Sequence, residues 1–171
     1  PAGVSRILAK VVGITPATRT DQTVYDPTCG SGSLLLKAAD EAPRGISIYG
    51  QEMDNATAAL ARMNMILHDN PTAEIWQDNT LADPPWLEDG GLKRVDFAVA
   101  NPPFSNKNWT SGLTPTNDQF NRFTWGIPPE KNGDYTFLLH IIKSLKSTGK
   151  GARASIFRQG HSKGLNLDSI L

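Results

Sequence analysis

The chain has very few cysteines and no long apolar run. Its 171 residues include a single cysteine, Cys29, which excludes an internal disulfide bond and fits a reducing compartment. No apolar stretch approaches the roughly 20 residues of a membrane-spanning helix, and the start of the chain lacks the pattern of a signal peptide. We therefore expect a cytoplasmic protein without membrane contact.

The chain also lacks an excess of charge. Its 17 Lys and Arg residues are balanced by 17 Asp and Glu residues. A protein that grips nucleic acid by itself usually carries a basic excess, because it must neutralise phosphates. If the chain acts on DNA, much of the binding should come from elsewhere. The three histidines, His68, His140 and His161, have no metal-ligand spacing, so no metal site is expected.

Apolar periodicity predicts an alternation of strands and helices. The expected strands cover residues 23–25, 46–49, 73–76, 95–100 and 152–157. The expected helices cover residues 4–14, 34–42, 55–68 and 134–147. This alternation implies an α/β fold with a mostly parallel sheet, in which each crossover helix covers a face. Ligands of such folds bind outside the carboxyl ends of the strands, where Asp26, Glu52, Asp78 and Asn101 are expected.

A glycine turn joins the first expected strand to the first crossover helix, in the segment VYDPTCGSGSLLL. Gly30 and Gly32 allow a tight turn and a close approach of a ligand to the backbone. The helix start, which includes Ser31, presents free N–H groups to a polar or anionic ligand. The spacing is neither that of a dinucleotide-binding motif nor that of a phosphate loop. For the glycines alone, a plain strand-to-helix turn is the alternative.

The pair Asp26-Pro27 favours a ligand site at this turn. A carboxylate at the end of a strand is placed to meet the cation or amine of a ligand. S-adenosylmethionine carries a sulfonium and an α-ammonium group, and its carboxylate suits the helix N-terminus. We therefore interpret this segment as a cofactor site.

Polar residues also follow the second and third expected strands. Glu52 is placed to accept hydrogen bonds from ribose hydroxyls. Its alternative role as a helix cap suits Asp54 or Asn55 better. Asp78 and Asn79 are placed to contact the adenine amine of the cofactor, with an Asx turn as the alternative.

The segment Asn101-Pro102-Pro103-Phe104 ends the fourth expected strand. The adenine amino group is a poor nucleophile, because its lone pair is delocalised into the ring. The Asn101 side-chain oxygen and the Pro102 carbonyl can each accept one N–H of this amine, and the prolines keep both acceptors rigid. Phe104 offers a face on which a flipped base can stack. A simple turn is the alternative, which the preceding glycine motif makes less favoured.

The motifs DPTCGSGS, YGQEMD, ARMNMILHD and NPPF together resemble the modification (methyltransferase) subunit of type I restriction-modification systems, over about residues 1–150. The resemblance implies an N6-adenine DNA methyltransferase with a Rossmann-like fold. It also implies S-adenosylmethionine as cofactor, DNA as substrate, and a DNA-specificity subunit, often with a restriction subunit, as partners. Such partners would explain the neutral charge.

The end of the chain departs from this family. Residues 151–171 read GARASIFRQGHSKGLNLDSIL and lack the Leu-Pro-x-Gly segment and further strands of family members. We expect residues 1–150 to form the catalytic core, with the last strands of the fold missing. Residues 151–171 are then an atypical tail, for which a truncation or a frameshift is one explanation.

Three questions stay open at this stage. Residues 106–132, which hold Trp109, Phe120, Phe123 and Trp125, either contact the target base or DNA, or form an ordered excursion that packs its own aromatic residues. The substrate amine is alternatively that of a protein glutamine or of RNA. A non-catalytic binding module, an inactive remnant that docks on partner subunits, is a further alternative.

Overall fold

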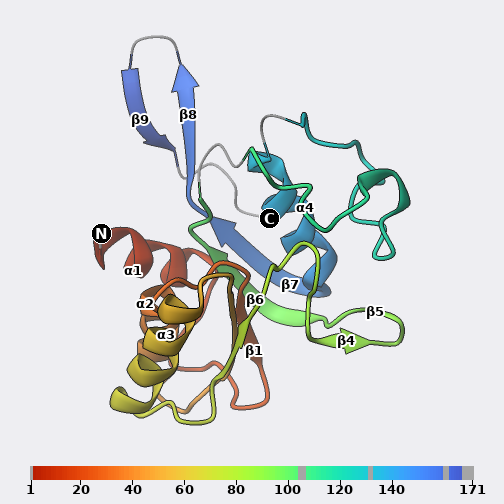
Figure 1. Cartoon of the computed structure of the whole chain (residues 1–171). Coiled ribbons are helices and arrows are strands. Elements are labelled where there is room, and N and C mark those ends of the chain that lie inside the picture. Colours follow the sequence, from red (N-terminus) through yellow and green to blue (C-terminus); the bar gives the residue numbers. More distant parts are fainter. Residues whose placement is uncertain (1, 104–106, 131–132, 160–161, 167–171) are drawn as a thin grey trace.

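A single parallel sheet organises the chain, as the computed structural model shows for residues 2–103, 107–130, 133–159 and 162–166 (Figure 1). Its strands are β1 (Thr23–Asp26), β2 (Ser47–Glu52), β3 (Glu74–Gln77), β6 (Val95–Ala100) and β7 (Leu145–Arg153). They lie in the order β3-β2-β1-β6-β7, and every neighbouring pair is parallel. The predicted α/β fold is confirmed, and the ends of β1, β2, β3 and β6 meet at one edge of the sheet.

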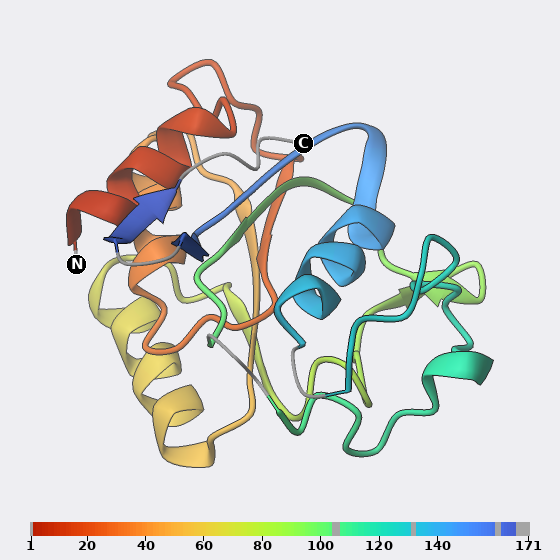
Figure 2. The same ribbon diagram turned by 90° about the horizontal axis from the view of Figure 1, so that it is seen from above.

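Helices cover both faces of the sheet. Seen from above, α1 (Ala2–Val11), α2 (Ser33–Asp40) and α3 (Asn55–Leu67) lie on one side, and α4 (Asp134–Ser144) lies on the other (Figure 2). Successive strand residues point to opposite faces, so each face has its own core. Val24 of β1 packs with the first three helices, whereas the next residue, Tyr25, packs with Ile141 of α4.

The junction between α4 and β7 differs from the sequence prediction. The helix ends at Ser144, not at residue 147, and β7 begins at the next residue and continues to Arg153, past the expected core boundary at residue 150. Ser147, Thr148 and Gly149 are poor helix formers, and the pairing of β7 with β6 is irregular across this stretch. The polar run is therefore accommodated as an irregularity within the strand.

The predicted strand over residues 152–157 was wrong as one element. Its first residues end β7, whereas β8 (Ser155–Gln159) leaves the sheet and pairs antiparallel with β9 (Ser162–Asn166). The start of β7 was not predicted, because the residues before 152 are rich in Gly and Lys and neither residue type favours a strand.

A second antiparallel hairpin lies in the segment 83–93, which is outside the strands and helices expected from the sequence. It consists of β4 (Leu87–Glu88) and β5 (Gly91–Leu92). Asp89 and Gly90 between them have positive φ angles of 51° and 75°, as the Asp-Gly turn of a hairpin requires. No helix in the described part of the chain is long and apolar enough to cross a membrane.

Residues 107–130 belong to the long segment between β6 and α4, and we call them the excursion. Trp109 and Phe123 are buried and pack with Leu81, which follows β3, and with Phe137 of α4. The interpretation as an excursion that packs its own aromatic residues is confirmed for these residues.

Candidate active site

Asp26, the last residue of β1, has a buried carboxyl group. Its side chain is 1% exposed, and Oδ1 accepts hydrogen bonds from the backbone N–H of Thr28 at 2.9 Å and from its hydroxyl at 3.4 Å. Burial raises the pKa of Asp26 to about 7, against the lowering effect of Thr28 and with a smaller contribution from the charge of Glu52. A cation beside this carboxyl would favour its charged form.

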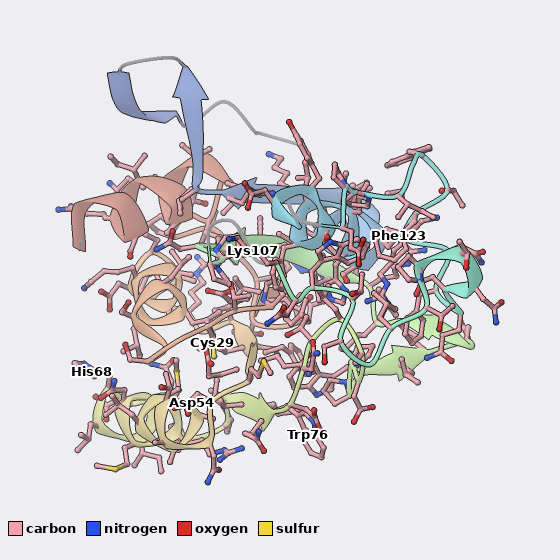
Figure 3. All side chains as sticks on the ribbon, turned by 45° about the horizontal axis from the view of Figure 1, so that its top comes forward. Cys29, Asp54, His68, Trp76, Lys107 and Phe123 are labelled. Carbon is pink, nitrogen blue, oxygen red and sulfur yellow. The ribbon has the colours of Figure 1, made fainter. Side chains whose placement is uncertain are left out.

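Glu52, the last residue of β2, joins two of the loops at the sheet edge. Its Oε2 accepts from the Gly30 N–H at 3.0 Å, and its Oε1 accepts from the Asp54 N–H at 2.9 Å. Asp54 caps α3 by accepting from the Thr57 N–H at 2.8 Å, which confirms the predicted cap (Figure 3). A carboxylate has about four acceptor sites, so Glu52 can still accept bonds from a ligand.

The turn between β1 and α2 depends on two glycines with positive φ. Gly30 has φ 55°, and a Cβ built there meets no atom within 4 Å, so the space beside it is open. Gly32 has φ 81°, and its Cβ would lie 2.6 Å from Met65 Cε of α3. As the N-cap of α2, Gly32 offers no side chain to the helix start. The first N–H groups of α2 are therefore left without a side-chain cap from this position.

The loop after β3 forms an Asx turn. Asn79 Oδ1 accepts from the Leu81 N–H at 3.1 Å, and Asn79 Nδ2 donates to the Ser111 carbonyl at 3.1 Å. Asp78 Oδ1 accepts from the Asn79 N–H at 2.6 Å. The Asx-turn alternative is thus present, while contact of Asp78 and Asn79 with a ligand stays a prediction.

Hydrogen bonds connect the three loops. The Thr80 hydroxyl donates to the Pro27 carbonyl at 2.5 Å, and the Asp78 N–H donates to the Glu52 carbonyl at 3.1 Å. Asn64 Nδ2 of α3 donates to the Ser31 carbonyl at 2.9 Å. The predicted residues after β1, β2 and β3 therefore belong to one connected edge.

Asn101-Pro102-Pro103 follows β6, which is the sheet neighbour of β1. Asn101 and Pro103 are exposed, and Pro102 is buried. The Ala154 N–H donates to the Ala100 carbonyl at 2.9 Å and fixes the end of the strand. Phe104 lies outside the described residues. An accessible amide thus stands on a rigid support next to the strand that carries Asp26.

Comparison with known proteins decides the family. A sequence model described as N-6 DNA Methylase matches residues 1–163. The chain belongs to the N-6 DNA methylase family. A relative, the type I restriction enzyme MpnII methylase subunit of Mycoplasma pneumoniae, is 32% identical over 89% of this chain and 30% of its own length. The MjaVII methylase subunit of Methanocaldococcus jannaschii is 29% identical over 99% of this chain and 30% of its own.

A solved structure of the family has the same fold. The type I restriction-modification methyltransferase subunit from Streptococcus thermophilus superposes with a TM-score of 0.75 at 33% identity, over 94% of this chain and 35% of that protein. The chain spans less than a third of the length of the curated relatives above.

A buried polar network lies behind the candidate site and was not predicted from the sequence. Arg122 and Asp118 form an ion pair with an N–O distance of 2.7 Å and side chains 1% and 3% exposed. Arg122 Nη1 lies 3.3 Å from His140 Nδ1, and His140 Nε2 lies 3.0 Å from the Tyr25 hydroxyl. The opposite charges of Asp118 and Arg122, four residues apart, could have indicated the ion pair. Nothing in the sequence indicates the contact between His140 and Tyr25.

His140 is neutral in this network. Burial lowers its pKa to about 3, and the charge of Arg122 acts in the same direction. Because the guanidinium can only donate, His140 Nδ1 accepts, and Nε2 carries the proton that it donates to the Tyr25 oxygen. The hydrogen bonds of this network therefore run in one direction, from Arg122 through His140 to Tyr25.

Proposed function

We propose that the chain is the catalytic core of an S-adenosylmethionine-dependent methyltransferase. It transfers a methyl group to the N6 amino group of adenine in DNA and belongs to the modification subunit of a type I restriction-modification system. The proposal rests on one edge of the sheet, where Asp26 and Glu52 end β1 and β2 and the exposed Asn101 follows the neighbouring strand β6. Membership of the N-6 DNA methylase family supports the same chemistry.

The residues at this edge fit the proposed cofactor. The open space beside Gly30 admits a ligand to the backbone, and the start of α2 suits its carboxylate. Asp26, with its pKa of about 7, would ionise beside the positively charged groups of the cofactor. Glu52 would accept from ribose hydroxyls, and Asp78 and Asn79 would face the adenine. When bound, S-adenosylmethionine supplies the electrophilic methyl group.

The chain's contribution at the target amine is to accept its hydrogen bonds. Asn101 Oδ1 and the Pro102 carbonyl each accept one N–H, which localises the nitrogen lone pair and aims it toward the cofactor side. The buried Pro102 restricts the backbone, so the acceptors need no reorganisation when charge develops. Pro103 extends this rigid support, and Phe104 is predicted to stack on the flipped base.

The partner proposal follows from charge. The chain has a formal net charge of zero, which gives it little electrostatic affinity for phosphates. We therefore propose that a DNA-specificity subunit supplies most of the DNA binding, and that a restriction subunit joins the complete system.

The function is tested by labelled methyl transfer. The full-length protein with its specificity subunit is incubated with S-adenosylmethionine, labelled in the methyl group, and with DNA from a methylation-deficient host. N6-methyladenine should appear in the digested DNA, and the Asn101→Ala variant should produce none. Label in cytosine, in protein or in RNA instead of adenine in DNA would contradict the proposal.

A further inference from the structure

A chain of buried polar contacts connects the excursion to the sheet. It begins at Asp118 in the excursion and passes through Arg122 to His140 of α4 and Tyr25 of β1. The Arg122–His140 and His140–Tyr25 links span 18 and 115 positions of the sequence, and the chain of contacts ends at the residue before Asp26. The proposed methyl-transfer chemistry uses none of these four side chains.

Arg122 is the branching point of this chain. Asp118 Oδ1 accepts from Arg122 Nη2 at 2.7 Å and from Nε at 3.1 Å, and Asp118 Oδ2 accepts from the Arg122 backbone N–H at 2.6 Å. The same Nη2 donates to the Leu81 carbonyl at 2.8 Å. The guanidinium also lies over the rings of Phe120 and Phe123, at 5.2 and 5.6 Å from their centroids. One planar cation therefore fixes the excursion to the loop after β3.

The excursion also packs directly on that loop. Ser111 accepts from Asn79 Nδ2, and a Cβ at Gly112 would lie 2.9 Å from the Ala82 side chain. Phe123 packs with Leu81 on the side of α4 (Figure 3). The excursion thus rests on residues 79–82, directly next to the positions proposed to face the cofactor adenine.

We infer that Arg122 is a positioning residue that couples the cofactor loop to the excursion. The inference rests on the proposed function only in that it takes residues 78–80 as part of the cofactor site. Ordering this loop fixes the Leu81 carbonyl, and Arg122 transmits that order to Asp118 and to His140. The excursion starts just after the residues proposed to hold the target amine. Arg122 therefore holds the target side of the site in register with the cofactor side.

A lysine cannot replace Arg122 in this role. The guanidinium presents five N–H donors in a fixed plane, and it reaches acceptors on Asp118, Leu81 and His140 together. An ammonium group on a flexible stem keeps the charge but cannot reach all three acceptors in one geometry. Arg122→Lys therefore keeps the positive charge and removes the simultaneous contacts that position the excursion.

Hydrogen exchange measures the coupling without reference to methyl transfer. In the full-length protein, S-adenosylmethionine should slow exchange at residues 78–82 and, by about tenfold, in the excursion. Arg122→Lys should keep the first effect and lose the second. Arg19→Lys, which alters an exposed pair with Asp21, is the matched control and should keep both. Cofactor-induced protection of the excursion that persists in Arg122→Lys would overturn the inference.

Kinetics separate positioning from a merely structural role. Arg122→Lys should lower the kcat of methyl transfer about tenfold or more while the cofactor Kd changes less than about threefold. An unchanged kcat per folded molecule with a lower Tm would overturn the inference.

If Arg122→Lys does not fold, Tyr25→Phe is the second variant. It removes only the hydroxyl at the end of the chain of contacts and should weaken the coupling, and unchanged coupling in that variant overturns the inference. If the wild-type protein transfers no methyl group, the proposed function fails, and hydrogen exchange still decides the inference.

Discussion

At the scale of single residues, the burial of Asp26 predicts that the unfolding free energy depends on pH. Its pKa is about 7 in the folded chain and 3.8 when unperturbed, so folding favours the protonated form. The resulting stabilisation is complete below about pH 4 and is lost as the pH rises through 7. Asp26→Asn should remove this dependence. Relative to Asp26→Asn, the wild type should lose on the order of 4 kcal/mol of unfolding free energy between pH 4 and pH 8.

Urea denaturation of both proteins at a series of pH values measures this difference. The unfolding free energy of the wild type should fall relative to that of Asp26→Asn as the pH rises from about 4 to 7, and the two curves should run parallel above pH 7. A difference in unfolding free energy that stays constant over this range would show that Asp26 is ionised to the same extent in the folded and unfolded chains.

Gly30 tests the proposed cofactor space at the same scale. An alanine at φ 55° costs about 1 kcal/mol of stability, and its Cβ would occupy the open space beside the turn. Gly30→Ala should therefore weaken S-adenosylmethionine binding by about tenfold or more, beyond the small loss of stability. Gly90→Ala is the matched control, because Gly90 also has a positive φ of 75° and an open Cβ position, but lies in the β4–β5 turn. Equal cofactor affinity in both variants, measured by calorimetry, would count against the site.

At the scale of secondary-structure elements, the strands with apolar residues were predictable and the α4–β7 junction was not. Val24, Val95 and Val99 mark strands that are buried on both faces, and such runs are read directly from the sequence. The start of β7 is set by its pairing with β6, and Ser147, Thr148 and Gly149 carry no local signal for it. The pairing between strands therefore sets where β7 begins, because the local propensity of these residues is weak.

The residues of the candidate site also fall into a group that could be located from the sequence and a group that could not. The common location of Asp26, Gly30, Gly32, Glu52 and Asn101 was predictable, because each lies at or just after the end of a strand and parallel strands end at a common edge. Their contact with a ligand stays a prediction. The Arg122 network was not predictable, because a contact between His140 and Tyr25 depends on how α4 crosses the sheet. Residues at the ends of strands can be located from the order of the strands, whereas the partners of a side chain on a helix depend on the packing.

The excursion also makes a prediction at this scale. Trp109 is 1% exposed, packs against Phe123 at a centroid distance of 5.6 Å, and donates to the Pro129 carbonyl at 3.1 Å. Trp109→Ala should lower the unfolding free energy by about 3 to 5 kcal/mol. Trp125→Ala, in the same segment but 71% exposed, should change it by less than about 0.5 kcal/mol. Similar losses from both substitutions in thermal denaturation would show that the excursion is not held by its buried aromatic residues.

At the scale of the whole molecule, the balanced charge of the chain leads to a prediction about DNA binding. With 17 basic and 17 acidic residues, the isolated chain should bind duplex DNA weakly, with a Kd of about 1 µM or more at physiological salt. Binding should weaken further as salt is raised and should not depend on sequence. Fluorescence anisotropy with several duplexes tests this, with the complex containing the specificity subunit as the positive comparison. Tight, sequence-specific binding by the chain alone would refute the division of labour.

The most direct measurement of the central claim is single-turnover methyl transfer by the full-length protein and its Asn101→Ala variant, with cofactor binding measured in parallel. Loss of one preorganised acceptor should raise the barrier by about 3 kcal/mol or more, which slows methyl transfer to adenine at least about a hundredfold. Cofactor affinity should stay nearly unchanged, because the proposed cofactor contacts lie after β1, β2 and β3. Asn101→Asp should be milder, since a carboxylate still accepts a hydrogen bond. Methylation by Asn101→Ala at the wild-type rate would contradict the account and leave the segment after β6 as a turn.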